Sequence, residues 1–141
     1  MLYLTARAIG QANSSRKYIQ NLRQDQDQKS LPGGPLIMSP DRMMTSFNRE
    51  VIYRKPHVFK IACLTNIYNL FPPDQHPFYC GFGNRETDAV SYGSVDIPID
   101  KVFIINPDGE ITQPEKPSYQ KTYSQLADMC EEMFPTIADR K

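Results

Sequence analysis

The sequence has no tryptophan, only two histidines and only three cysteines among its 141 residues. The cysteines, Cys63, Cys80 and Cys130, are far apart and odd in number, so we predict reduced core residues and not a disulfide framework. His57 and His76 each neighbour a proline, and no cysteine or carboxylate stands at zinc-ligand spacing from either. A zinc site and a histidine-activated serine or cysteine nucleophile are therefore not expected.

The sequence also has no excess of charge, because Lys plus Arg and Asp plus Glu both number 16. Nucleic-acid binding rests on an excess of basic charge, so the balance argues against that class of partner. The same neutrality predicts no polybasic surface for docking on anionic membranes. No apolar run is long enough for a membrane span, and the first residues do not resemble a signal peptide. We therefore expect a cytoplasmic protein without a transmembrane segment.

The remaining composition is that of a small globular domain, with 40% apolar and 23% charged residues. Short apolar runs that favour strands alternate along the chain with segments of helical periodicity. Strands are predicted at 2–5, 36–38, 78–82 and 102–105, and helices at 8–22, 39–55, 59–70 and 119–133. This alternation predicts a three-layer, Rossmann-like α/β fold, in which helices cover both faces of a parallel sheet.

Ligands of such sheets bind beyond the carboxyl ends of the strands, so the residues that follow each strand are the candidates for a site. Thr5 ends the first predicted strand, and Ala6 and Arg7 follow it. A hydroxyl beside the amides that open a helix, with an arginine two residues later, suits a phosphate group. The alternative is that Thr5 only ends the strand and that Arg7 is solvated.

Two further candidate sets follow later in the chain. Asn84 and Asp88 come after the strand that ends at Phe82, and on a helical segment they can direct two oxygens at one Mg²⁺. The alternative is a turn with unusual backbone angles, in which Asp88 is a surface acid. Lys55, with Lys60 as a competitor, can neutralise charge on a transferring phosphoryl group, although most lysines are simply solvated.

In this order, the segments resemble the lipin phosphatidate phosphatases of the haloacid dehalogenase superfamily. The likeness runs over nearly the whole chain. The matching stretches are 3–10, 34–40, 49–52 with 55–56, 59–60, 63–64, 70–71, 77–79, 82–85 with Asp88, and Phe103 with 106–107 and 109–110. The resemblance implies the haloacid dehalogenase type of fold and a Mg²⁺-dependent reaction. That reaction converts phosphatidic acid to diacylglycerol and phosphate through an aspartyl-phosphate intermediate.

The resemblance also implies a role for each candidate residue. Residues 5–7 hold the substrate phosphate, and Thr5 supplies the hydroxyl of the superfamily's second motif. Lys55 fits the third motif better than Lys60 does. Asn84 and Asp88 fall on the fourth motif, which helps to hold Mg²⁺. The implied partner is phosphatidic acid at a membrane surface, which would make the protein peripheral at the endoplasmic reticulum or nuclear membrane.

The sequence departs from the superfamily at the first motif, Asp-x-Asp-x-(Thr/Val), which carries the nucleophile on a strand before Thr5. No such motif precedes Thr5 here, and Asp25 and Asp27 have the spacing but lie in a glutamine-rich polar segment. We therefore expect residues 1–141 to be the C-terminal part of a single phosphatase domain, inactive without its N-terminal half and the strand that bears the nucleophile. The alternatives are a non-catalytic module that senses phosphatidic acid and a pseudoenzyme fragment.

Overall fold

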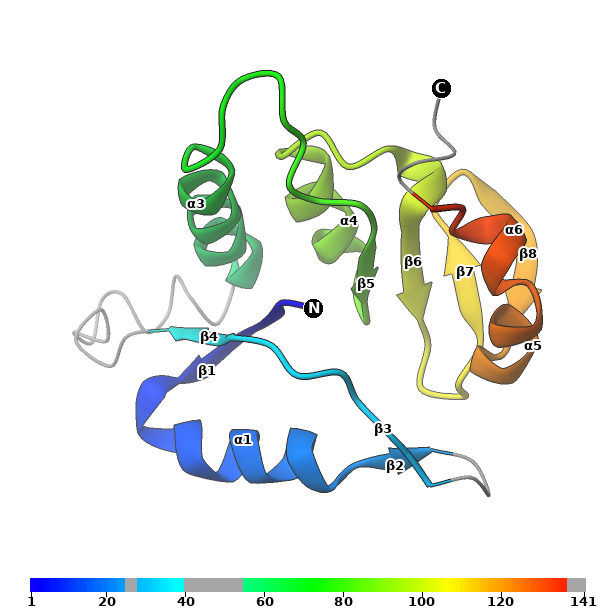
Figure 1. Cartoon of the computed structure of the whole chain (residues 1–141), viewed down its shortest axis with the longest axis horizontal. Helices are drawn as coiled ribbons and strands as arrows, with labels where there is room; N and C mark the ends of the chain where they lie inside the picture. The colour runs from blue at the N-terminus through cyan, green and yellow to red at the C-terminus, as the bar shows by residue number, and fades with distance from the viewer. Residues whose placement is uncertain (25–27, 40–54, 137–141) are drawn as a thin grey trace. The chain divides into compact units, whose positions relative to one another are not determined.

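The computed structural model of the chain describes residues 1–24, 28–39 and 55–136 (Figure 1). The chain divides into two compact units, Met1–Ala62 (unit 1) and Cys63–Lys141 (unit 2), and each is described by itself. Both units combine strands with helices, so the predicted α/β class is confirmed. The helix predicted at 39–55 lies outside the described residues, apart from the residues at its two ends.

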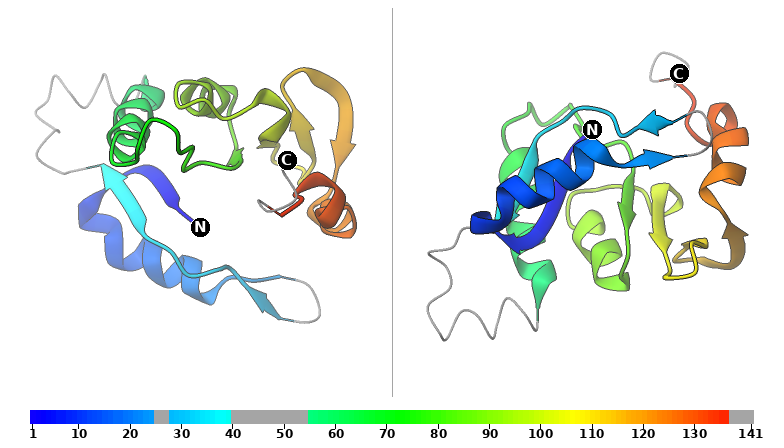
Figure 2. Two further views of the ribbon diagram at one scale, coloured as in Figure 1. Left: turned by 45° about the horizontal axis from the view of Figure 1, so that its top comes forward. Right: turned by 90° about the horizontal axis from the view of Figure 1, so that it is seen from below.

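Unit 1 is built on two parallel strands, β1 (Tyr3–Ala8) and β4 (Leu36–Ser39). Parallel neighbours need a crossover connection. Here the short 3₁₀ helix η1 (Ile9–Gln11) leads into α1 (Ala12–Asn21), which lies across β1 (Figure 2). Both predicted strands and the predicted helix are present, but β1 continues to Ala8 and the helix begins correspondingly later.

A short hairpin follows α1. Its strands, β2 (Arg23–Gln24) and β3 (Lys29–Ser30), pair in antiparallel fashion. Asp25 and Asp27 lie outside the described residues, between these two strands.

Helix α3 (Pro56–Tyr68) crosses the boundary between the two units. Pro56 occupies the first helical position, where a backbone N–H would have no partner within the helix and the fixed φ of proline suits the helix. The helix predicted over 59–70 is thus confirmed, and it ends before the proline pair that follows Phe71.

Unit 2 contains a four-stranded sheet in the order β5 (Gly81–Gly83), β6 (Val102–Ile105), β7 (Ile111–Gln113) and β8 (Lys116–Lys121). Only β5 and β6 are parallel, whereas β7 and β8 are antiparallel to their neighbours. The expectation of an all-parallel sheet is therefore wrong for this part of the chain.

The reason is the turn at Asn106, which sends the chain straight back alongside β6. The Asn106 Oδ1 atom accepts the backbone N–H groups of Asp108, at 3.0 Å, and Glu110, at 2.9 Å. Gly109 takes a φ of +83°, which a side chain would oppose. An asparagine that bonds to its own backbone two residues later is a turn former, and here the turn makes a hairpin instead of leading to a helix.

The helix predicted over 119–133 is also wrong in its first part. Tyr119 lies in β8, and Thr122 caps the next helix, α5 (Tyr123–Asp128). The Thr122 side chain accepts the backbone N–H of Gln125, and the Gln125 side chain accepts the backbone N–H of Thr122. This reciprocal capping box fixes the helix start at residue 123. A second short helix, α6 (Cys130–Met133), follows.

The two faces of the β5–β6 pair in unit 2 are covered differently. Helix α4 (Glu86–Gly93) packs against β5 and β6 on one face (Figure 1). On the other face Phe82 stacks on Phe103, with ring centroids 5.0 Å apart, and Phe134 packs against both rings. Phe103, Ile111 and Leu126 form the buried core on that side.

Candidate functional site

The candidate phosphate residues of unit 1 lie in the last part of β1, where its pairing with β4 becomes irregular. Thr5 is opposite Met38 and Ala8 is opposite Ser39, so two residues of β1 have no counterpart in β4. Those two residues are Ala6 and Arg7. The regular ladder therefore ends at Thr5, but β1 itself continues to Ala8, so the predicted end of the strand at Thr5 is three residues too early.

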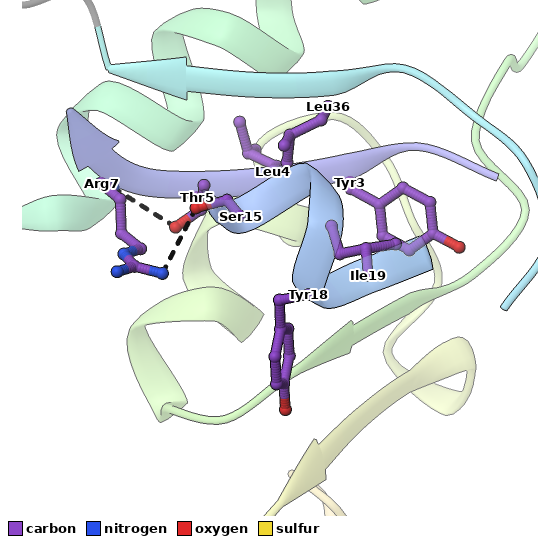
Figure 3. Close-up of a pocket in the computed structure, with 8 residues that line it drawn as sticks. All are labelled: Tyr3, Leu4, Thr5, Arg7, Ser15, Tyr18, Ile19 and Leu36. Carbon is purple, nitrogen blue, oxygen red and sulfur yellow. Dashed lines mark hydrogen bonds between the residues drawn. The ribbon is translucent and has the colours of Figure 1, made fainter. Parts of the chain in front are cut away.

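Arg7 is held beside Thr5 by three hydrogen bonds. Its backbone N–H donates to the Thr5 Oγ1 atom at 3.3 Å. Its guanidinium donates from Nη1 to Ser15 Oγ at 3.3 Å (Figure 3). The guanidinium also donates from Nε to Gln11 Oε1 at 3.2 Å. A guanidinium has five N–H donors, and these two bonds engage two of them. These two bonds hold the cation near Gln11 and Ser15 and leave donors for an anion.

A cavity of about 240 Å³ lies between β1 and α1 and includes these residues. Polar groups gather at one end of it and apolar and aromatic side chains at the other, as Figure 3 shows. The lining residues are Thr5, Arg7 and Ser15, with Tyr3, Leu4, Tyr18, Ile19 and Leu36. Pockets for whole drug-sized ligands are about 300–1,000 Å³, so this cavity suits a part of a ligand that has one polar end.

The two candidate lysines differ in exposure. Lys55 is exposed and directly precedes α3, whereas Lys60 lies within α3 and is half-buried. Both belong to unit 1.

The candidate metal residues of unit 2 lie where β5 gives way to α4. Asp88 stands in the first turn of α4 and is only 2% exposed, so the alternative of a surface acid is wrong. Its Oδ2 atom accepts the backbone N–H of Asn84 at 3.0 Å. Among the described residues, positive φ angles occur only at Gln28, Asp96 and Gly109, so the segment at Asn84 does not have the unusual backbone of the alternative turn.

Glycine at position 83 is what allows the Asp88 carboxylate to approach β5. A Cβ atom on Gly83 would lie 2.6 Å from the Asp88 Oδ2 atom and closer still to the Asp88 Cβ atom. The side chain of Asn84, in contrast, is exposed. The two oxygen-bearing side chains therefore belong to one short segment, one of them buried and one open to solvent.

Tyr92, one helical turn after Asp88, was not singled out by the sequence patterns. Its hydroxyl donates to the Phe82 carbonyl oxygen. Burial raises the pKa of the Tyr92 phenol, and the Asp88 carboxylate and Cys80 raise it further. A Cβ atom on Gly81 would lie 2.5 Å from the Tyr92 ring. The signal in the sequence is a Gly-x-Gly strand followed by an Asp and a Tyr four residues apart.

The structure thus groups residues 5–7 with Ser15 in unit 1, and Asn84 with Asp88 in unit 2. Within the described ranges, no three His, Cys, Asp or Glu side chains lie close enough together to hold a metal ion by themselves. Of the helices in the same ranges, none is both long enough and apolar enough to cross a membrane.

Comparison with known proteins places these residues in a family. Residues 1–135 match the model of the LNS2 (Lipin/Ned1/Smp2) family. Phosphatidate phosphatase PAH1 of Arabidopsis thaliana is 50% identical over 135 residues, which are 96% of this chain and 15% of that protein. Nuclear elongation and deformation protein 1 of Schizosaccharomyces pombe is 45% identical over 141 residues, which are 97% of the chain and 21% of that protein.

Phosphatidic acid phosphohydrolase 1 of Saccharomyces cerevisiae is 43% identical over 150 residues, covering 98% of the chain and 17% of that protein. The chain therefore spans about a fifth or less of the length of these relatives. The resemblance inferred from the motifs is confirmed along almost the whole sequence. The chain belongs to the LNS2 (Lipin/Ned1/Smp2) family, the family of the lipins.

Proposed function

We propose that this chain forms part of a Mg²⁺-dependent phosphatidate phosphatase, which converts phosphatidic acid to diacylglycerol and phosphate. The observation that carries the proposal is the family match over residues 1–135 together with an arginine bonded to Thr5 and Ser15 where the pairing of β1 with β4 becomes irregular. The names of the relatives from Arabidopsis thaliana and Saccharomyces cerevisiae state this activity for those proteins. We also propose that residues 1–141 are the C-terminal part of a single domain of the haloacid dehalogenase type.

In this proposal residues 5–7 of unit 1 bind the substrate phosphate. The Thr5 hydroxyl and the backbone at Ala6 face the phosphate oxygens, and the guanidinium of Arg7 adds charge-assisted hydrogen bonds, while the Arg7 backbone N–H is bonded to Thr5. Ser15 and Gln11 hold the guanidinium in place, so less side-chain freedom is lost when the anion binds.

Lys55 is proposed to neutralise negative charge on the transferring group, with Lys60 as the competing candidate. Lys55 is exposed and so is accessible to a ligand, whereas Lys60 is half-buried in α3.

Asn84 and Asp88 of unit 2 have side-chain oxygens of the type that Mg²⁺ prefers, a carboxamide and a carboxylate. Mg²⁺ also keeps several waters, so a few protein ligands can suffice. Two residues do not make a complete cage, so further ligands would come from outside this pair. When bound, the ion would neutralise charge on the phosphate oxygens. The chain's own contribution is to hold the Asp88 carboxylate in a fixed position through its bond with the Asn84 N–H.

The nucleophile of the proposed reaction is an aspartate in an Asp-x-Asp-x-(Thr/Val) motif, which is not among these residues before Thr5. Attack by that aspartate on the phosphorus would break the bond to the diacylglycerol oxygen, which takes a proton from the second aspartate of the motif, and water would then hydrolyse the aspartyl-phosphate intermediate to free phosphate. Catalysis is therefore proposed for the chain only in combination with such a motif. We further propose a cytoplasmic protein that acts at the surface of a membrane.

The test is a chimera in which this chain replaces the matching segment of the Saccharomyces cerevisiae relative. We expect Mg²⁺-dependent release of phosphate from phosphatidic acid in mixed micelles. Asp88→Asn should abolish most of that activity, and Asp108→Asn, which makes the same substitution at an exposed aspartate, should retain it. Full activity of the Asp88→Asn chimera would remove Asp88 from the site.

The same chimera separates the remaining alternatives. Lys55→Gln should reduce kcat if Lys55 is the motif lysine, and an effect confined to Lys60→Gln would transfer the role to Lys60. A folded chimera that binds phosphatidic acid and releases no phosphate would instead favour a sensing module or a pseudoenzyme.

A further inference from the structure

Two hydrogen bonds from α4 hold the end of β5, one on each side of Gly83. The Tyr92 hydroxyl donates to the carbonyl oxygen of Phe82, which belongs to the peptide group before Gly83. The Asp88 Oδ2 atom accepts the N–H of Asn84, which belongs to the peptide group after Gly83, at 3.0 Å. Side chains of one helix therefore hold both peptide groups that flank the Gly83 Cα atom.

A glycine benefits from such support more than any other residue does. Without a Cβ atom its backbone has a wide choice of φ and ψ, and it loses more conformational freedom on folding than other residues lose. Position 83 cannot take a larger residue freely, because a Cβ atom there would overlap the Asp88 side chain. The residue directly before Asn84 is thus intrinsically flexible, and bonds from outside the strand must supply its rigidity.

The Tyr92 ring is placed against β5 by packing as well as by its hydroxyl. A Cβ atom on Gly81 would overlap the ring, which shows how closely the two residues approach. Asp88 and Tyr92 are four residues apart in α4, so they project from the same face of the helix, and α4 lies beside β5 (Figure 1). A ring has only two side-chain torsions to fix, so packing of this kind places the hydroxyl at a low entropic cost.

The two candidate ligands differ in what holds them. The Asp88 side chain is only 2% exposed and is enclosed by packing against Gly83. The Asn84 side chain is exposed, so its position follows from that of its own backbone. Whatever orients the peptide groups around Gly83 therefore determines where the Asn84 carboxamide can reach.

We propose that Tyr92 is a positioning residue for the cation site formed by Asn84 and Asp88. It acts through the carbonyl group of Phe82 and touches neither the cation nor the substrate. Its hydroxyl fixes the peptide group before Gly83, so the backbone that leads to Asn84 is oriented before a cation arrives. The inference rests on the proposed function in one respect, namely that Asn84 and Asp88 bind Mg²⁺.

Magnesium makes the position of each ligand important, because it takes its ligands in a nearly ideal octahedron at about 2.0–2.1 Å. Groups that orient the ligands of a metal typically change its affinity by about 10–100-fold when they are removed. Tyr92 acts through the backbone that precedes a ligand, so we expect an effect at the lower end of this range, about 10-fold.

The first measurement follows the backbone of the full 141-residue chain without any metal. Hydrogen exchange of the Asn84 amide, measured by NMR, reports how often its bond to Asp88 opens. Tyr92→Phe removes only the hydroxyl and keeps the ring beside Gly81. It should raise the exchange rate of the Asn84 amide by about 5-fold, the effect of one lost hydrogen bond.

Tyr79→Phe is the matched control. The Tyr79 hydroxyl also donates to a backbone carbonyl oxygen of unit 2, that of Pro135, at 2.9 Å. The control should lose a similar amount of global stability, measured by urea unfolding, and leave the exchange of the Asn84 amide unchanged once that loss is taken into account. Equal acceleration by both variants, or no acceleration by Tyr92→Phe, would overturn the proposal.

The second measurement follows the cation in the chimera. Mn²⁺ suits the same octahedral oxygen sites as Mg²⁺ and is detected by electron paramagnetic resonance. Tyr92→Phe should raise the dissociation constant for Mn²⁺ by about 10-fold and the Mg²⁺ concentration for half-maximal activity by a similar factor, with nearly the full rate at saturating Mg²⁺. Tyr79→Phe should change neither quantity. An unchanged dissociation constant in Tyr92→Phe, or a low rate that saturating Mg²⁺ does not restore, would argue against a positioning role.

Gly81→Ala tests the same bond by a second route. The added Cβ atom should displace the Tyr92 ring and weaken Mn²⁺ binding as Tyr92→Phe does. The two substitutions combined should weaken binding no further than Gly81→Ala alone, because the hydroxyl bond can be lost only once. Fully additive effects would show that the hydroxyl is not the route.

The outcomes separate this inference from the proposed function. A chimera that binds Mn²⁺ and releases no phosphate would refute the proposed reaction, while amide exchange and Mn²⁺ titration still decide the role of Tyr92. An active chimera in which Tyr92→Phe and Tyr79→Phe behave alike would keep the proposed function and remove the role of Tyr92. An unchanged chimera that binds no Mn²⁺ would refute the cation site and this inference together.

Discussion

Gly83 and Asp88 are in van der Waals contact across the junction of β5 and α4, so that a Cβ atom on Gly83 would overlap the Asp88 side chain. We predict that Gly83→Ala displaces the Asp88 carboxylate and lowers the Mg²⁺-dependent activity of the chimera nearly as far as Asp88→Asn does. Overpacking of this kind costs about 1–3 kcal/mol of the free energy of unfolding. Urea unfolding of the 141-residue chain measures that cost.

Gly93, the last residue of α4, is the matched control. A Cβ atom there meets nothing within 4 Å, and its φ is not positive. Gly93→Ala should therefore raise stability by about 0.5–1 kcal/mol and leave activity unchanged. If both alanine variants behaved alike, the contact between Gly83 and Asp88 would not be what positions the carboxylate.

Ser15 is predicted to position Arg7 for the phosphate. Ser15→Ala removes the acceptor of the Arg7 Nη1 hydrogen bond and should raise KM of the chimera for phosphatidic acid by about 10-fold or less, with a smaller effect on kcat. Ser15→Thr keeps a hydroxyl and should restore part of the loss. Asn13→Ala, on the exposed side of α1, is the control. A fall in kcat at unchanged KM would argue against a role in phosphate binding.

We predict that the folded chain loses stability at high pH because of Tyr92. Burial, the Asp88 carboxylate and Cys80 hold the pKa of its phenol above the ordinary value of about 10. The folded state then keeps a proton that the unfolded state loses, so this contribution to stability is complete below pH about 10 and declines as the pH rises from there towards the folded-state pKa.

Urea unfolding midpoints on both sides of pH 10 measure this decline. Tyr92→Phe should flatten it, whereas Tyr18→Phe, at a ring that is 66% exposed, should not. Some decline should remain in Tyr92→Phe, because burial also raises the pKa of Tyr119 and Tyr123. An unchanged pH dependence in Tyr92→Phe would exclude this group as its source.

The capping box at Thr122 predicts a local stability effect. Thr122→Ala leaves the Gln125 backbone N–H without its acceptor and should lower the free energy of unfolding by about 1 kcal/mol. Ser124→Ala, one residue inside α5 at an exposed position, should be neutral or slightly stabilising. Urea unfolding compares the two variants.

Much of the fold could be predicted from local patterns. The strand at Val102–Ile105 was predicted with its observed bounds, because four consecutive apolar residues end at an Asn-Pro-Asp-Gly turn. The turn itself was recognised, but the hairpin that it makes was not. Tyr119 shows the reason, because its spacing of four residues from Tyr123 also fits a helix. In the structure Tyr119 lies in β8, which pairs with β7, so this segment is a strand.

The candidate site was predictable in its residue types but not in its packing. Thr5, Arg7 and Asp88 follow strands in the sequence, which was enough to single them out. The contact of Gly83 with Asp88, and that of Gly81 with Tyr92, depend on how α4 lies on β5, and neither glycine marks that contact by itself.

Two contacts join β5 to α4, that of Gly83 with Asp88 and that of Gly81 with Tyr92, and together they fix the number of residues between the strand and the helix. Two residues of a strand advance about 6.6 Å, and four residues of a helix advance about 6.0 Å. The spacing of Gly81 and Gly83 along β5 therefore matches the spacing of Tyr92 and Asp88 along α4. One residue inserted within the first turn of α4 would rotate the rest of the helix by about 100° relative to the strand. Residues 85–87, which lie between the candidate site residues, should therefore tolerate changes of side chain more readily than any insertion or deletion.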